Sequence, residues 1–111
     1  MVHCPRQGDI VWLSFEPQAG HEQAGHRPAL ALSPESYNRK TGLALFCPLT
    51  SQVKGYPFEV PLPIDLKVTG VVLSDQVKSL DWRARGAKFH CKAPATVVET
   101  VIGQLEALLD A

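Results

Sequence analysis

Along residues 8–92, apolar and polar positions alternate in short runs separated by turn-forming residues, a pattern typical of β-strands. The first run, 8–15, is rich in β-branched and aromatic residues. Val11, Leu13 and Phe15 fall on one face of such a strand. Ile10, Trp12 and Ser14 fall on the other face. Both sets are largely apolar, so we expect both faces of this strand to be partly covered.

Two segments between the strands carry turn signals. Residues 16–27 form a long loop, and loops of this length in a compact domain are usually functional or disordered. Residues 33–42 allow one helical turn with Ser33 as its cap and Pro34 as its first helical residue. Further short strands are expected over 28–33, 43–49, 57–62, 70–73 and 86–92, with 74–82 either continuing or restarting the strand before it.

The last segment has a helical period. Apolar residues recur there at three- and four-residue spacing, which indicates an amphipathic helix; they are Val97, Val98, Val101, Ile102, Leu105, Leu108 and Leu109. Its start is open between Pro94, which suits the first helical position, and Thr96, which begins a capping-box pattern. Gly103 is interpreted as a point of close packing on the sheet. Together these elements predict one domain over 1–111, mainly β with α, built as a small, partly open barrel with a helix packed on it.

Composition narrows the functional class only slightly. Apolar residues make up 45% of the chain and charged residues 20%, which is ordinary for a globular domain. No apolar run is long enough to span a bilayer, and residues 1–6 lack the apolar core of a secretory signal. An odd number of cysteines without a C-x-x-C pair fits reduced thiols, so a cytoplasmic location is expected.

Two His-Cys pairs, at residues 3–4 and 90–91, raise the possibility of a zinc site. Neighbours on an extended chain point to opposite faces, so one metal ion cannot easily take both members of a pair. We therefore expect neither a metal nor a cofactor.

The formal net charge is zero, which excludes a global cationic field for nucleic acid. The charge is uneven, however, because residues 78–92 carry five basic side chains and one acid. This segment forms either a local basic face or a solvated mixed surface.

Polar groups gather in four segments that lie in loops or at strand ends, over 22–27, 37–38, 50–54 and 75–85. They contain no Gly-rich phosphate loop, zincin helix or nucleophile elbow. Arg27 precedes a proline, which favours extended geometry and makes its guanidinium either a candidate anion site or an ordinary solvated arginine. Composition and spacing therefore predict a β-rich domain with a polar, cation-bearing loop cluster.

Five blocks of sequence extend this interpretation. They are 8–12 (GDIVW), 22–29 (EQAGHRPA), 48–52 (PLTSQ), 54–60 (KGYPFEV) and 75–86 (DQVKSLDWRARG). In order and spacing they closely resemble the MazF/PemK/ChpB family of toxin endoribonucleases. The resemblance implies an SH3-like, plasmid-toxin-type β-barrel with short helices and a C-terminal helix, usually assembled as a homodimer.

The resemblance also implies an activity and a partner. Members cleave single-stranded RNA, mainly messenger RNA, at short sequences without a metal ion. The ribose 2′-hydroxyl attacks the adjacent phosphate and leaves a 2′,3′-cyclic phosphate and a 5′-hydroxyl. The cognate partner is an antitoxin of the MazE/PemI/ChpS type, whose acidic, disordered tail covers the RNA groove.

Carried over by position, the family's catalytic residues fall on Arg27, Thr50 and Glu22. Arg27 suits a clamp on phosphate oxygens better than proton transfer, because a guanidinium does not readily lose its proton. Glu22 is either the general base or a carboxylate that orients Arg27. Thr50 either donates a hydrogen bond to a phosphate oxygen or bonds local backbone. His26 is a further candidate for proton transfer, although RNA contact or a role in the loop is preferred.

Other residues are candidates for reading bases, neutralising phosphates or stacking on bases. They are Gln23, His26, Asn38, Lys54, Gln76, Lys78, Arg83, Arg85 and, as weaker stacking candidates, Phe15 and Trp82. Residues 61–69 vary within the family, so no cleavage sequence is transferred. Two other functions stay open: a non-enzymatic toxin of the same fold that binds a topoisomerase, and a nucleic-acid-binding module without turnover.

Overall fold

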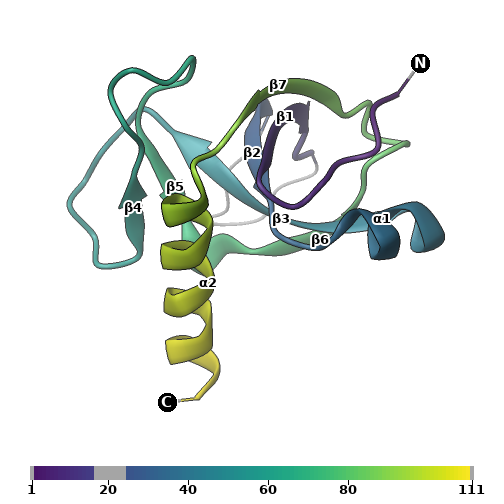
Figure 1. Ribbon diagram of the computed structural model, residues 1–111. Coiled ribbons are helices and arrows are strands. Elements are labelled where there is room, and N and C mark those ends of the chain that lie inside the picture. Colours follow the sequence, from purple (N-terminus) through teal and green to yellow (C-terminus); the bar gives the residue numbers. More distant parts are fainter. Residues whose placement is uncertain (1, 17–24, 111) are drawn as a thin grey trace.

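The computed structural model describes residues 2–16 and 25–110 (Figure 1). Glu22 and Gln23, two of the predicted site residues, lie outside these ranges. The elements within them are β1 (Asp9–Ser14), β2 (His26–Ala31), α1 (Glu35–Thr41), β3 (Leu43–Thr50), β4 (Glu59–Pro61), β5 (Val71–Leu73), the 3₁₀ turn η1 (Ser74–Gln76), β6 (Lys78–Asp81), β7 (Lys88–Lys92) and α2 (Ala95–Leu109).

Six of the seven strands pair antiparallel in the order β4-β5-β3-β2-β1-β7, and β6 pairs antiparallel with β3 off this path. Strand β3 is shared most widely: one edge pairs with β2, and the other edge pairs first with β6 and then with β5. Figure 1 shows the resulting curved sheet with α2 standing against its β4–β5 side. Strands β4 and β7 end the sheet without pairing to each other, so the predicted barrel is open.

Both faces of β1 are partly covered, as its sequence predicted. Val11, Leu13 and Phe15 belong to one buried apolar cluster, and Ile10 belongs to a second cluster that includes residues of α2. Phe15 is 1% exposed. Its proposed role as a stacking partner for RNA is therefore wrong, because the ring fills the core beneath the sheet. Trp82, the other stacking candidate, is buried in the same cluster.

Several element boundaries differ from the predictions. Strand β2 begins at His26, two residues earlier than expected. Of the two alternatives for 74–82, the structure has the one in which the strand restarts, as β6 after η1. The helical turn is a seven-residue helix, α1, whose N-cap is Pro34 instead of Ser33. Helix α2 follows an N-cap at Pro94, so Thr96 lies inside the helix and does not form a capping box.

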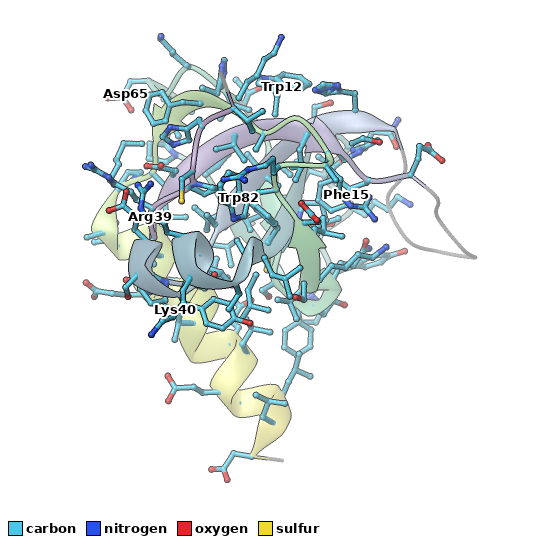
Figure 2. All side chains as sticks on the ribbon, turned by 90° about the vertical axis from the view of Figure 1, so that its right-hand side faces the viewer. Trp12, Phe15, Arg39, Lys40, Asp65 and Trp82 are labelled. Carbon is cyan, nitrogen blue, oxygen red and sulfur yellow. The ribbon has the colours of Figure 1, made fainter. Side chains whose placement is uncertain are left out.

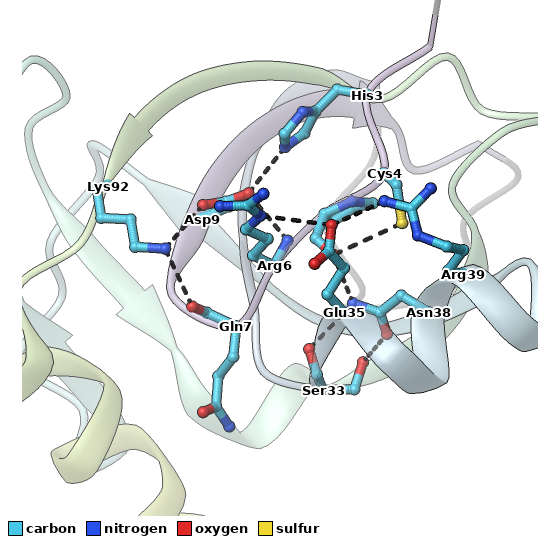
Figure 3. Close-up of polar contacts among 11 residues, drawn as sticks. His3, Cys4, Arg6, Gln7, Asp9, Ser33, Glu35, Asn38, Arg39 and Lys92 are labelled. Carbon is cyan, nitrogen blue, oxygen red and sulfur yellow. Dashed lines mark hydrogen bonds and ion pairs between the residues drawn. The ribbon is translucent and has the colours of Figure 1, made fainter.

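Ser33 and Asn38 form a buried polar hub beside α1 (Figure 3). The Asn38 amide donates to the carbonyls of Pro5 and Ser33 and accepts from the Ser33 hydroxyl, while its backbone carbonyl accepts from the indole of Trp82. Asn38 is fully buried. The prediction that it contacts RNA is therefore wrong, because all of its hydrogen-bonding groups already hold α1 against the sheet.

Helix α2 buries Val97 and Val101 against the sheet. Gly103 is exposed, and a Cβ built on it has no atom within 4 Å. The expected close packing at this glycine is therefore absent.

Replacing Gly103 with alanine is expected to raise the free energy of unfolding by up to about 1 kcal/mol, because it removes the helix penalty of glycine without a clash. Urea denaturation followed by circular dichroism measures the change. Ala107→Gly, at an exposed position of the same helix, is the matched reverse variant and is expected to lose a similar amount. A loss of stability in Gly103→Ala would contradict the geometry described here.

The carboxylate of Asp9 ties the N-terminal segment to β7 (Figure 3). It accepts hydrogen bonds from Nε2 of His3 at 2.8 Å, the backbone N–H of Arg6 at 2.9 Å and Nζ of Lys92 at 3.2 Å. Burial by itself raises the pKa of Asp9, but these three donors outweigh it and hold the pKa below its usual value.

Because its folded-state pKa is lowered, Asp9 stabilises the fold above its unfolded pKa, and that contribution is lost as pH falls below about 4. Asp9→Asn is expected to reduce the free energy of unfolding at pH 7 by about 1–3 kcal/mol and to flatten its decline on acidification. Urea denaturation between pH 3 and 7 measures both effects. Asp65→Asn, at an exposed aspartate, serves as the control. A wild-type pH slope in Asp9→Asn would exclude this role.

Candidate active site

Arg27 and Thr50 are brought together by the pairing of β2 with β3. The β2–β3 ladder ends with Ala29 opposite Pro48, so Arg27 and Thr50 each lie two residues beyond this pair on neighbouring strands. The Nη1 of Arg27 donates a hydrogen bond to the carbonyl of Leu49 at 3.3 Å. Both Arg27 and Thr50 are half-buried. A guanidinium and a hydroxyl are therefore presented close together, where β2 begins and β3 ends.

A cleft of about 580 Å³ opens beside this pair. Its lining is basic and polar, since it contains Arg27, Lys67 and two histidines, and no acidic residue lines it among the residues that the structure describes. The full lining is Trp12, His26, Arg27, Pro28, Leu49, Thr50, Ser51, Gln52, Lys67, Val68, Thr69 and His90. Such a lining favours an anionic ligand with flat, partly apolar groups.

The backbone at Thr50 is fixed closely by its neighbours. Gly70 has φ +113°, and a Cβ placed on it would lie 2.1 Å from the Thr50 carbonyl oxygen. The Thr50 Oγ1 accepts the N–H of Gln52 at 3.1 Å. Because that bond uses the oxygen as an acceptor, the hydroxyl hydrogen remains available for donation into the cleft.

A second, smaller hollow of about 340 Å³ also borders Thr50. Thr50 and Gln52 line both spaces, and the second is also lined by Lys54, Asp75 and Gln76. Thr50 therefore borders both a cationic cleft and a hollow with carboxylate, amide and ammonium groups.

Glu59 holds the loop that covers the second hollow. Its carboxylate accepts the backbone N–H groups of Lys54 and Gly55, the latter at 2.9 Å. The Lys54 ammonium lies 6.0 Å from the centre of the Tyr56 ring. A lysine and a tyrosine from one anchored loop are thus presented beside Thr50.

The basic residues of the 78–92 segment do not gather in the cleft with Arg27. Arg83 lies over the Trp82 ring at 5.0 Å and lines a different cleft, next to the N-terminal segment. Arg85 donates to the carbonyls of Ser14 and Glu16 and braces the end of β1. Lys78 lies on β6 opposite Phe46. Of the predicted RNA-contacting residues, His26, Lys54 and Gln76 border Thr50's two hollows, and Arg83 does not.

Burial disfavours the thiolate form of all three cysteines. Burial raises the pKa of Cys47 to about 12 and also raises those of Cys4 and Cys91. Over 2–16 and 25–110, no three His, Cys, Asp or Glu side chains converge as a metal site. In the same part of the chain, no helix is long and apolar enough to cross a membrane.

Among the residues of the cleft that sequence reasoning missed are Trp12, Lys67 and His90. The alternation in β1 placed Trp12 opposite the core face of Val11 and Leu13, which was the available signal. No sequence signal pointed to His90 as a cleft residue, because its position depends on an irregularity in the pairing of β1 with β7.

The chain matches a family model described as "PemK-like, MazF-like toxin of type II toxin-antitoxin system" over residues 6–109. It is 58% identical over 85 residues to the endoribonuclease toxin MazF of Escherichia coli K12, which covers 77% of this chain and 76% of that protein. A crystal structure of MazF from Deinococcus radiodurans superimposes with a TM-score of 0.94 at 57% identity, over 98% of this chain and 99% of that one. A MazE–MazF structure from the same organism gives 0.88 at 57% identity and covers 97% of each chain.

Proposed function

The chain belongs to the family of PemK-like, MazF-like toxins of type II toxin–antitoxin systems, and we propose from this membership that it is an endoribonuclease toxin. Its substrate is single-stranded RNA, mainly messenger RNA, and cleavage inhibits translation and growth in the cytoplasm. The observation that carries the proposal is that Arg27 and Thr50 line one basic cleft, in which the described lining contains no acid. That arrangement suits a phosphodiester whose neighbouring bases enter the two hollows.

The reaction begins with the ribose 2′-hydroxyl next to the scissile phosphate. As its proton is removed, the 2′-oxygen bonds to phosphorus, the bond from phosphorus to the 5′-oxygen breaks, and a proton is supplied to that leaving oxygen. The products are a 2′,3′-cyclic phosphate and a 5′-hydroxyl. Each step is metal-independent, because the nucleophile is internal to the substrate and the charge is stabilised by side chains.

Arg27 stabilises the charge that develops on the phosphorane oxygens, because its planar fork can donate two hydrogen bonds to them. Thr50 donates its hydroxyl hydrogen to a phosphate oxygen. The base is either His26, which borders the cleft, or Glu22, which lies outside the described residues. This scheme requires no cofactor.

The proposed partners follow from the same family. The related structures from D. radiodurans contain MazE together with MazF, and we expect an antitoxin of the MazE type, with an acidic, disordered tail, to cover the cleft of this chain. A homodimer is proposed as the working assembly. Size-exclusion chromatography with light scattering measures the mass of the free protein, and a monomer at working concentration would exclude the dimer.

One assay separates this function from its alternatives. Purified protein is incubated with mixed-sequence RNA in EDTA, and the ends of the products are mapped. Cleavage that yields 5′-hydroxyl ends and stops when the nucleotide at the cut carries a 2′-deoxyribose supports the proposal. RNA that stays intact leaves a binding module or a topoisomerase-directed toxin, and cleavage of the 2′-deoxy substrate excludes the 2′-hydroxyl as nucleophile.

Thr50→Val is expected to lower kcat by about 10²-fold, because it keeps the shape of the side chain and removes one donor to the transition state. Thr50→Ser keeps the hydroxyl and is expected to retain most of the activity. Both variants are measured by initial rates on a fluorogenic RNA that contains the mapped site. Equal rates for the valine and serine variants would remove the hydroxyl from the mechanism.

A further inference from the structure

Three rings stand in a row across the outer face of β2, β1 and β7. The Trp12 ring on β1 lies 5.9 Å from the His26 ring on β2 and 5.9 Å from the His90 ring on β7, measured between centroids. The His90 ring meets Trp12 edge-on, at 85°. All three residues line the cleft that contains Arg27.

His90 reaches this row through an irregularity in the sheet. Ile10 pairs with Cys91 and Val11 pairs with Phe89, so one step along β1 spans two steps along β7 and leaves His90 as the extra residue of a β-bulge. A bulge locally changes the direction of a side chain, and bulges are frequent beside active sites. Here Cys91 packs against the core cluster that contains Ile10, while His90 lies against Trp12.

The row is more exposed than a packing role requires. Trp12 is 36% exposed, whereas Trp82, the other tryptophan, is 2% exposed and donates its indole N–H to the backbone carbonyl of Asn38 (both tryptophans are labelled in Figure 2). An accessible ring with imidazoles on both sides combines a flat apolar surface with hydrogen-bonding edges. These are the features by which proteins hold unpaired bases of single-stranded RNA.

We propose that Trp12, His26 and the bulged His90 form a platform for the base of one of the two nucleotides that flank the scissile phosphate, with His90 as a specificity-determining residue. The inference rests on the proposed function and adds a subsite to it. Arg27 lies in the same cleft, so a phosphate held by its guanidinium has the platform within reach of an adjoining base. The base on the other side of the phosphate is left for the hollow beyond Thr50.

The test uses a short RNA that contains the mapped cut site, either intact or abasic at one flanking position at a time. His90→Ala is expected to lower kcat/KM on intact RNA by roughly 5- to 50-fold, mainly through KM, because stacking is lost while the reacting groups stay in place. Removing the base that occupies the platform is expected to cost the wild type a similar factor. On that abasic RNA, His90→Ala is expected to add less than about a twofold loss, because the contact it removes is already missing.

Two variants on the same strand separate a base contact from a general effect. His90→Phe keeps a flat ring and is expected to stay within about threefold of wild type on intact RNA, which a purely structural role of the imidazole would not allow. Phe89→Ala removes an exposed ring next in sequence that faces His3 and a different cleft, and it is expected to cleave at the wild-type rate. Equal losses for His90→Ala on intact and on both abasic RNAs would overturn the platform.

A second readout keeps the subsite testable apart from cleavage. Mixed-sequence single-stranded RNA is titrated against the tryptophan fluorescence, and quenching that disappears in Trp12→Phe and weakens in His90→Ala supports the platform. Absence of Trp12 quenching overturns it. If the wild type binds and quenches but never cuts RNA, the endoribonuclease proposal fails while the base platform stands.

Discussion

Replacing Arg27 with alanine is expected to slow RNA cleavage by about 10³-fold, the largest catalytic effect of any single substitution in this chain. The guanidinium is the charged group that lies beside Thr50 at the strand pairing, and the alanine variant leaves the charge on the phosphorane without its donors. The loss should appear in kcat, because the interaction strengthens as charge develops. Single-turnover cleavage of an RNA containing the mapped site measures it.

Two further arginine variants make this result specific. Arg27→Lys keeps the positive charge but loses the planar fork, so it is expected to recover only a small part of the rate. Arg39→Ala removes an arginine on α1 that is 66% exposed and pairs with Glu35 at 2.8 Å, and its cleavage rate is expected to equal that of wild type. Full activity in Arg27→Ala with a folded protein would remove Arg27 from the site.

Gly70→Ala is expected to produce the largest structural effect, a fall in the free energy of unfolding of about 3 kcal/mol or more. The new Cβ would lie 2.1 Å from the carbonyl oxygen and 2.8 Å from the carbonyl carbon of Thr50, and the backbone at Gly70 already has a positive φ. Because the clash is with the backbone of Thr50, cleavage should fall in the molecules that stay folded. Thermal unfolding and cleavage rates measure the two effects.

Gly55→Ala is the matched control for backbone strain. Gly55 has φ +80°, but a Cβ at this position meets no atom within 4 Å. It is therefore expected to cost only about 1–2 kcal/mol, the penalty of a left-handed residue without a clash. If Gly55→Ala and Gly70→Ala lose the same stability, the close approach to Thr50 is not what makes glycine necessary at position 70.

Most of the fold could be predicted from local patterns. Alternation in 8–15 predicted β1 and its two partly covered faces, and the helical period after Pro94 predicted α2. The wrong predictions have a common cause: at these positions the structure is determined by tertiary contacts and not by the local sequence. Ser33 is not a helix cap because its hydroxyl oxygen accepts the N–H of Leu45 and its hydrogen is donated to Asn38. No local pattern indicates that Asn38 is enclosed by Pro5 and Trp82.

The candidate site was only partly predictable for a related reason. Arg27 and Thr50 were identified by resemblance, and their juxtaposition comes from a strand register that composition cannot supply. The basic 78–92 segment was misleading, because charges that are close in sequence are directed to separate surfaces and to backbone carbonyls. His90 required knowledge of the bulge, which is a property of two paired strands and not of either alone.

The pairing of β3 with three other strands has a consequence for local unfolding of the protein. One of its edges is held by β2, and the other is divided between β6 and β5, so Thr50 cannot be released without breaking ladders that hold the rest of the sheet. Backbone amides of β3 should therefore exchange with solvent only through global unfolding, while the 52–56 loop exchanges by local fluctuation. Ligands that need to rearrange this protein must act on the loops around Thr50, because the strand that carries it moves only when the whole domain unfolds.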